Sequence, residues 1–281
     1  MKKYSVRAYC LVVMTALLLN MPCVGLAAET IRINGSGSAL DMMKPIIAAF
    51  QNTNKNITIV MEKPLGSSGA LKALLAGALD VVLSSKQLKP EDVARGARLE
   101  VYGKTPLVLI AEKNVRITNI TSRELENIYT GKTTKWPNGE VIRLVLRPQE
   151  DIDSKIIASL SPGMAQAMTT VRSRPGMIVA VTDPEAFSAV SKTPGGLGAT
   201  GMTSIIVEKI PVTSFSLNGV TANPRTLADG TYQLSKEISI VTTAKTPAAA
   251  NRLIHFMHSA QGRAIAARNG VLVTSGAAAL K

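Results

Sequence analysis

Residues 66–85 read GSSGALKALLAGALDVVLSS, and this stretch decides the fold. Gly66-Ser67-Ser68-Gly69 is a turn of small and hydroxyl-bearing residues, and Ala70 to Ala78 strongly favours a helix. Val81-Val82-Leu83 then reads as a buried strand that ends in Ser84-Ser85. A helix N-terminus carries unpaired backbone N–H groups and a partial positive charge. The turn therefore predicts either an ordinary N-cap or a site for a small anion.

The same order of features occurs just upstream. Ile31 to Asn34 alternates like a short strand, Gly35-Ser36-Gly37-Ser38 follows it, and Leu40 to Phe50 has apolar residues at helical spacing. Ile57 to Met61 is a second strand that leads into the turn at 66–69. Repeated βα units imply a parallel sheet, and ligands gather outside the carboxyl ends of its strands. The serines at these ends, which we expect to converge, are Ser36, Ser38, Ser67, Ser68, Ser84 and Ser85.

The first 28 residues predict a secretory signal peptide and therefore a periplasmic protein. They contain a basic start, an apolar core from Leu11 to Leu19 and the small-residue cleavage pattern Gly25-Leu26-Ala27. Both cysteines of the chain, Cys10 and Cys23, lie in this segment, so the mature chain would form no disulfide. The residues before Cys23 match a lipoprotein signal poorly.

The charge, the aromatic content and the length of the chain limit the kinds of partner and the number of domains that we expect. Removing the leader lowers the formal charge of +13 by three, to +10, because the segment holds three basic residues and no acidic one. The basic residues are dispersed, which favours solubility and loose attraction for anions. Aromatic residues make up 4% of the chain, which argues against a nucleic-acid stacking surface. About 250 mature residues suffice for one large or two modest domains.

The remainder of the chain continues the α/β pattern. Leu99 to Ala111 predicts a long strand that runs from one lobe to another, with a bend or an edge at Pro106. Thr121, Glu124 and Gly131 are the N-cap, the capping-box residue and the C-terminal glycine of a helix. Further predictions are strands at 144–146, 177–181, 205–207, 212–217, 238–241 and 271–273, helices at 156–168, 182–190 and 247–268, and a glycine-rich turn at 194–198.

Three apparent motifs are rejected. Gly131-Lys132-Thr133 resembles the end of a phosphate-binding P-loop, but Glu126 stands where its first glycine belongs. The glycines of 196–201 spell a dinucleotide fingerprint, but we expect them between a helix and a strand, the reverse of the required order. His255 and His258 share a helical face without the further ligands that a metal site needs. With only these two histidines and no Gly-x-Ser-x-Gly elbow, a hydrolase triad is not supported.

Arg147 is the most informative single charge. It follows the buried strand Leu144-Val145-Leu146, where a guanidinium can be held for a bidentate grip on an oxyanion. The alternative is a surface arginine paired with Glu150 or Asp151. Carboxylates left uncompensated beside a bound anion would repel it, so these acids bear directly on the ligand.

In this order the features resemble the phosphate-binding components of bacterial ABC transporters, within the type II periplasmic binding proteins. The resemblance covers nearly all of the mature chain. The stretches that carry it are Gly35-Ser36-Gly37-Ser38, Gly66-Ser67-Ser68-Gly69, Ala76 to Asp80, Ser84-Ser85, Ile120 to Trp136, Gly196-Leu197-Gly198 and Asp229 to Leu234. In the last of these, Gln233 replaces the proline of the family's Gly-x-Tyr-Pro-Leu signature.

The resemblance implies two α/β lobes with mixed sheets flanked by helices, joined by two crossing strands, that close on an anion. We expect lobe one at 29–111 and 214–281 and lobe two at 112–213. The ligand residues it implies are Ser36, Ser38, Ser67, Ser68, Gly69, Ser85, Arg147 and Ser154. Two departures concern the ligand: the family's Asp after the third strand is Ser85 here, and its Ser-Gly-Thr after the arginine is replaced by Glu150 to Ser154.

The sequence thus predicts an exported solute-binding protein that captures a small oxyanion, phosphate first, by hinge closure. We expect no catalytic residue, metal or cofactor, a monomer, and an ABC permease or a membrane sensor as partner. The alternative is a non-transport adaptor or sensor on the same scaffold, with an altered or lost anion site. A secreted phosphatase is a third reading, which turnover of an aryl phosphate would support.

Overall fold

The computed structural model describes residues 28–274, so positions 1–27 of the predicted signal peptide lie outside it. The first part of the chain alternates strands and helices as the βα pattern predicts. Its elements are β1 (Glu29–Gly35), α2 (Gly37–Thr53), β2 (Ile57–Met61), α3 (Gly66–Leu75), β3 (Val81–Ser84), α4 (Pro90–Ala94) and β4 (Arg98–Glu112).

The middle and last parts of the chain contain shorter elements. From residue 119 to 214 they are β5 (Asn119–Ile120), α5 (Ser122–Thr130), β6 (Arg143–Leu146), α6 (Ile152–Ala158), α7 (Pro162–Thr170), the 3-10 turn η1 (Val171–Ser173), β7 (Ile178–Val179), α8 (Asp183–Lys192), β8 (Gly196–Gly201), α9 (Met202–Glu208) and β9 (Val212–Ser214). They are followed by β10 (Ser216–Leu217), α10 (Pro224–Ala228), β11 (Ser235–Thr242), α11 (Ala248–His258), α12 (Ala260–Arg268) and β12 (Leu272–Val273).

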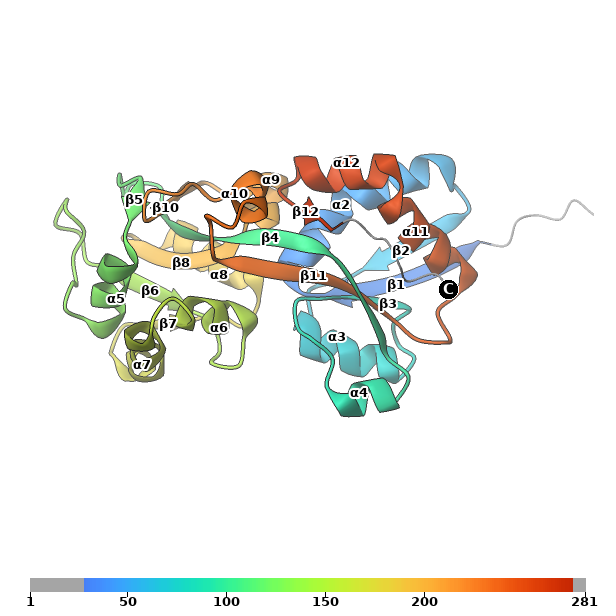
Figure 1. Cartoon of the computed structure of the whole chain (residues 1–281), viewed down its shortest axis with the longest axis horizontal. Coiled ribbons are helices and arrows are strands. Elements are labelled where there is room, and N and C mark those ends of the chain that lie inside the picture. Colours follow the sequence, from blue (N-terminus) through green and yellow to red (C-terminus); the bar gives the residue numbers. More distant parts are fainter. Residues whose placement is uncertain (1–27, 275–281) are drawn as a thin grey trace, which may run out of the picture.

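One mixed sheet runs through the molecule in the order β2-β1-β3-β11-β4-β8-β6-β7. Strand β1 pairs in parallel with β2 and β3, and β11 is antiparallel to both β3 and β4. The long strand β4 pairs with β11 over residues 98–106 and with β8 over residues 107–111. Strands β4 and β11 therefore run side by side through the middle of the molecule, and β4 continues beyond β11 to pair with β8 (Figure 1).

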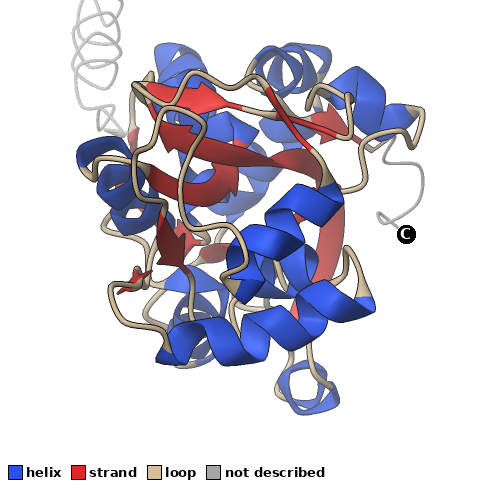
Figure 2. Ribbon diagram, turned by 90° about the vertical axis from the view of Figure 1, so that its left-hand side faces the viewer, coloured by secondary structure: helices blue, strands red, loops and turns tan. Residues whose placement is uncertain are grey.

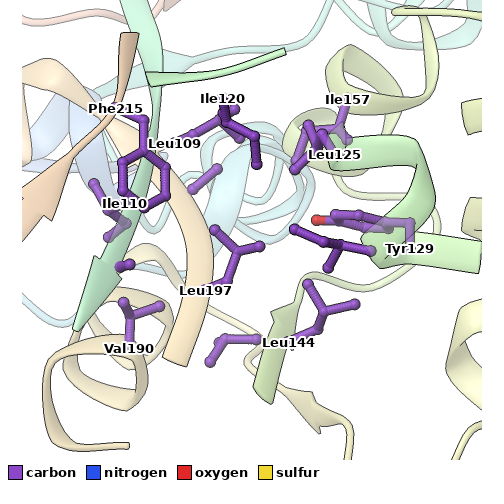
Figure 3. Packing of buried hydrophobic residues seen from close by; sticks show 14 of the residues in the cluster. Leu109, Ile110, Ile120, Leu125, Tyr129, Leu144, Ile157, Val190, Leu197 and Phe215 are labelled. Atoms are coloured by element: carbon purple, nitrogen blue, oxygen red, sulfur yellow. The ribbon is translucent and has the colours of Figure 1, made fainter. Parts of the chain in front are cut away.

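The two largest of three hydrophobic cores lie on either side of this crossing, and helices flank the strands (Figure 2). The first core joins β1, α2, β3 and α11 through residues such as Ile31, Ile46, Leu83 and Leu253. The second core joins β4, β6, β8, α5 and α8 (Figure 3). Burial of each such side chain contributes about 1.5–3 kcal/mol to the stability of the fold. Because the buried side chains recur at helix or strand spacing, the sequence pattern predicts the elements that line the cores. The predicted mixed α/β fold class is confirmed.

The second core also includes residues close to the predicted lobe boundary. Phe215, Leu217, Tyr232 and Leu234 pack in it together with the residues of β4 and β8. The Phe215 ring meets the Trp136 ring edge-on, with centroids 5.9 Å apart. The chain therefore stays with the second core from Phe215 to Leu234 and returns to the first core along β11, where Ile238 and Ile240 are buried.

The segment after α8 corrects two predictions, the turn at 194–198 and the strand at 205–207. The turn ends at Gly195, Gly196–Gly201 is the buried strand β8, and the strand expected at 205–207 is instead part of helix α9. A Cβ on Gly198 would lie 2.7 Å from Val190 Cγ2, so glycine lets α8 pack closely on β8. The dinucleotide fingerprint stays rejected, because its glycines lie inside a strand rather than in a strand-to-helix turn.

Two predicted helices are each divided in two. Pro162 occupies the first turn of α7, and α6 ends before it, because a proline has no N–H for the preceding turn. The helix expected at 247–268 breaks at Ser259, whose backbone is extended and whose side chain caps α12. The capping box of α5 is confirmed: Thr121 Oγ1 accepts from the Glu124 N–H at 3.1 Å, and Gly131 ends the helix with φ +82°.

Across residues 28–274 every helix falls short of the length and apolar character that a membrane crossing requires.

Candidate functional site

The start of helix α2 is capped from a distant part of the chain. Ser36 is its N-cap residue, but the Ser36 side chain makes no capping bond. The Gly37 N–H instead donates to Asp183 Oδ2 at 3.0 Å, and Ser38 Oγ donates to Asp183 Oδ1 at 3.3 Å. A Cβ at position 37 would lie 2.7 Å from the Asp183 Cβ, so glycine is needed for this approach. The helix end therefore holds a carboxylate.

Asp183 brings that carboxylate from the first position of helix α8. Thr182 already caps α8 by accepting from the Glu185 N–H, so the Asp183 carboxylate is free to reach α2. Burial by itself would raise the pKa of Asp183. The charges of Lys236 and Arg147 and the Gly37 N–H outweigh burial and hold this pKa below its ordinary value. Asp183 is therefore ionised at neutral pH.

Lys236 is the central cation of the site. Its Nζ lies 2.7 Å from Asp183 Oδ1 and 2.8 Å from Asp153 Oδ1, and the side chain is 1% exposed. Burial alone would lower the pKa of Lys236, but the two carboxylates raise it above its ordinary value. The lysine is therefore charged at any physiological pH.

Arg147 follows β6, as predicted, and is buried. Its Nη1 donates to the Ala180 carbonyl oxygen at 3.0 Å and its Nη2 to Asp151 Oδ2 at 3.0 Å. Asp151 is also the N-cap of α6, because its Oδ1 accepts from the Asp153 N–H at 2.9 Å. The predicted alternative, an arginine paired with Asp151, is thus present, but in the interior rather than at the surface.

Asp153 completes the group and is the least favourably placed carboxylate. It is fully buried, and its Oδ2 lies 3.8 Å from Arg147 Nε. Burial and the neighbouring Asp183 and Asp151 raise the pKa of Asp153 to about 6, against the opposing effect of Lys236 and Arg147. We call the whole group the cleft cluster: Arg147, Asp151, Asp153, Asp183 and Lys236.

The start of helix α3 differs from that of α2 and corrects the predicted turn at 66–69: the helix already begins at Gly66, with Leu65 as its N-cap residue and no side-chain cap. Gly66 has φ +69°, and Ser67 Oγ accepts from the Ser85 N–H at 2.9 Å. Ser68 is exposed, and Lys86 Nζ lies 3.4 Å from its Oγ and 2.8 Å from the Glu150 carbonyl oxygen. Ser85 is buried, and its Oγ has no hydrogen-bond partner among residues 28–274. Gly69 lies in the first turn of α3, directly after Ser68.

The predicted site residues fall into two groups, one around the cleft cluster and one around the start of α3. Ser38 contacts Asp183, Arg147 is part of the cleft cluster, and Ser154 Oγ donates to the Arg147 carbonyl oxygen at 3.1 Å. Ser67, Ser68 and Ser85 surround the start of α3. The Ser36 N–H donates to the Leu83 carbonyl oxygen at 2.9 Å, which ties the two groups together.

Sequence reasoning missed Asp183 and Lys236. A signal for Lys236 was present: strand alternation places it on the same face as Ile238 and Ile240, all of them buried. A lysine on the inward face of a strand needs a buried partner. For Asp183 the sequence offers only an acid at the start of a helix, which is ordinary.

A cavity of about 210 Å³ lies next to the cleft cluster, between α6 and α7. Ala158, Ala165 and Met168 line it on the apolar side, and Ser154 and Arg172 on the polar side. Arg172 Nη2 lies 3.3 Å from Ser154 Oγ, so its guanidinium is already engaged there. The cavity therefore reaches the cleft cluster through Ser154, which is bonded to Arg147. The start of α2 is not among the residues that line it.

A family model described as a PBP superfamily domain matches residues 24–261. The chain belongs to the PBP superfamily. The predicted resemblance to periplasmic binding proteins is thereby confirmed.

Individual members of the PBP superfamily are similar over most of the chain. The phosphate-binding protein PstS of Borreliella burgdorferi is 25% identical over 252 residues, which cover 87% of this chain and 90% of that protein. A Clostridium perfringens protein, assigned as the substrate-binding protein of a phosphate ABC transporter and solved with phosphate bound, has a TM-score of 0.75 at 20% identity. That match covers 88% of this chain and 100% of the other.

A second solved structure shows the same fold. An ABC-type phosphate transport receptor from Vibrio cholerae has a TM-score of 0.58 at 19% identity, covering 87% of this chain and 99% of the other. At these identities the structural likeness establishes the arrangement of the chain. The ligand has to be argued from the residues of the cleft cluster.

Proposed function

We propose that this chain is an exported, periplasmic solute-binding protein that captures a small oxyanion, phosphate first, for an ABC transporter. The observation that carries the proposal is made at the start of α2. There the Gly37 N–H, the Ser38 hydroxyl and the Lys236 ammonium converge on a buried carboxylate. Carboxylate and phosphate oxygens accept the same hydrogen bonds, so the groups suit a phosphate oxygen as well. The names of the PstS relative and of the solved structures support phosphate as the first choice.

The two cores correspond to two lobes that close on the solute about β4 and β11. We keep the predicted lobes, 29–111 with 214–281 and 112–213, with one adjustment. Residues 215–234 are assigned to the second lobe, since Phe215 and Leu234 pack in its core. Closure would bring Ser38 of one lobe to Arg147 of the other, with Ser36, Ser67, Ser68, Gly69, Ser85 and Ser154 at the margins of the site. The expected partner is an ABC permease or a membrane sensor, and the receptor would act as a monomer.

A second function, a non-transport adaptor or sensor with an altered or lost anion site, is favoured by one observation. The cleft cluster holds three carboxylates against two cations. An added anion would raise this negative excess in a buried place, which is costly because low-dielectric surroundings strengthen repulsion. No catalytic residue, metal or cofactor is part of either proposal.

Isothermal titration with phosphate, sulfate, molybdate and tungstate tests the choice. We expect saturable binding of one anion per chain, phosphate first, and loss of at least about a hundredfold in affinity for Arg147→Gln, which removes a buried charge-assisted contact. Arg143→Gln is the matched control, because Arg143 lies on the same strand with its side chain at the surface. Absence of heat with all four anions would refute capture of an oxyanion and support the adaptor or sensor.

A further inference from the structure

The anion position of the proposed site is occupied by the chain itself. Residues of the first lobe, Gly37 and Ser38, bind a carboxylate that belongs to the second lobe, at 3.0 and 3.3 Å. Lys236, on the strand that joins the lobes, binds the same carboxylate at 2.7 Å. Asp183 thus makes, across the cleft, the contacts that a bound oxyanion would make.

The other two carboxylates of the cleft cluster have different positions. Asp151 caps α6 and pairs with Arg147, so its contacts stay within the second lobe. Asp153 faces Lys236 and Arg147. Among the described residues, Asp183 is the carboxylate that hydrogen-bonds to the first turn of α2.

We infer that Asp183 competes with the ligand of this site: in the ligand-free chain it occupies the anion position and bridges the two lobes, and an oxyanion binds by replacing it. The inference rests on the proposed function for the identity of the ligand. Its physical basis is competition, because the Gly37 N–H and the Ser38 hydroxyl that bind Asp183 cannot bind a second anion in the same place, and two anions so close would repel each other. The chain would therefore bind oxyanions more weakly than the same cleft without the carboxylate.

The charge balance explains why the residue can be tested by a conservative change. Asp183→Asn keeps the size of the side chain and leaves two carboxylates facing two cations, so the variant is expected to fold. The amide can still accept from the Gly37 N–H, but it adds no negative charge. Asp183→Ala, which removes both the charge and the acceptor, is the second variant. Asp229→Asn is the control, since Asp229 is exposed and bonded to Thr231 in a loop.

The experiment combines two measurements on the full mature chain. Isothermal titration with phosphate, sulfate, molybdate and tungstate gives the anion affinities of the wild type and of the three variants, phosphate first. Small-angle X-ray scattering without phosphate gives the radius of gyration. We expect Asp183→Asn and Asp183→Ala to bind phosphate at least about tenfold more tightly, because a like charge is removed from the site. We also expect both to be more expanded when ligand-free, with Asp229→Asn unchanged.

The outcomes separate this inference from the proposed function. If the wild type binds phosphate and neither Asp183 variant gains affinity, the inference is overturned and the proposed function stands. If neither the wild type nor any variant binds any of the four oxyanions, the proposed function fails. The scattering data then test whether Asp183 bridges the lobes. Expansion of the variants then supports its role in closing the lobes, and an unchanged radius overturns it.

Discussion

The starts of helices α2 and α3 are similar in sequence and differ in structure. Each follows a parallel strand and begins within a run of glycines and serines, and each was a candidate anion site. At α2 this run is buried and receives the Asp183 carboxylate from the start of α8. At α3 the run forms the first turn of the helix, where Ser67 Oγ accepts from the Ser85 N–H and Ser68 stays exposed.

The difference shows that a serine–glycine turn provides donors without choosing their partner. The choice comes from which groups lie opposite the helix start. Opposite α2 lie the buried Lys236 of β11 and the three carboxylates Asp151, Asp153 and Asp183. Near α3 lies the backbone oxygen of Glu150, which accepts from Lys86 Nζ at 2.8 Å. The following substitutions test this difference between the two ends.

The largest effect is expected at the lysines. Lys236→Met leaves Asp153 and Asp183 buried without their common cation and should lower the free energy of unfolding by about 3–5 kcal/mol. Lys86→Met, at the α3 end, removes a half-exposed contact and should change it by less than about 0.5 kcal/mol. Urea unfolding at pH 7.5 measures both. Equal losses for the two variants would contradict the difference between the two ends.

The glycines give a smaller contrast. Gly37→Ala places a Cβ 2.7 Å from the Asp183 Cβ and should cost about 2 kcal/mol of stability, because the carboxylate must move from α2. Gly69→Ala meets only the Leu65 Cβ, at 3.3 Å, and Leu65 is exposed. Since alanine favours a helix over glycine, this variant should be within about 0.5 kcal/mol of the wild type. Thermal unfolding of the two variants measures both effects. A larger loss of stability for Gly69→Ala than for Gly37→Ala would contradict the proposed difference between the starts of α2 and α3.

The smallest expected effect depends on pH. The pKa of Asp153 is raised to about 6, so the folded state binds this proton more readily than the unfolded state does. The stabilisation is fully present below the ordinary aspartate pKa and is lost as pH rises through 6. Between pH 7.5 and 5 the wild type should gain about 1 kcal/mol relative to Asp153→Asn.

Urea unfolding of the wild type and Asp153→Asn at the two pH values gives this difference directly. The group that faces Asp153 consists of Lys236, Arg147, Asp151 and Asp183. A wild type that loses stability relative to the variant at pH 5 would show that Asp153 is ionised there in the folded state.

Several parts of the fold could be predicted from the sequence because they depend only on residues close together in the chain. The strand at 57–61 and the capping box at Thr121 were predicted as they occur. Errors arose where packing overrode the local pattern. Gly196–Gly201 reads as a turn but is a strand, since α8 packs too closely for side chains there. The helix at 247–268 breaks at Ser259, where a capping side chain starts α12.

The sequence by itself determined the α/β class, the two serine–glycine segments near helix starts and the arginine after a buried strand, because helix and strand periodicity and strand-end chemistry are local properties. Only the tertiary structure decided that the segment at 66–69 is already helical, that α2 binds Asp183, that Lys236 joins it to Asp153, and that the start of α3 has no such carboxylate among residues 28–274. These contacts link residues about 145 and 53 positions apart. Nothing in the local sequence encodes which buried charge faces which helix end, since that depends on how the two cores are placed about β4 and β11.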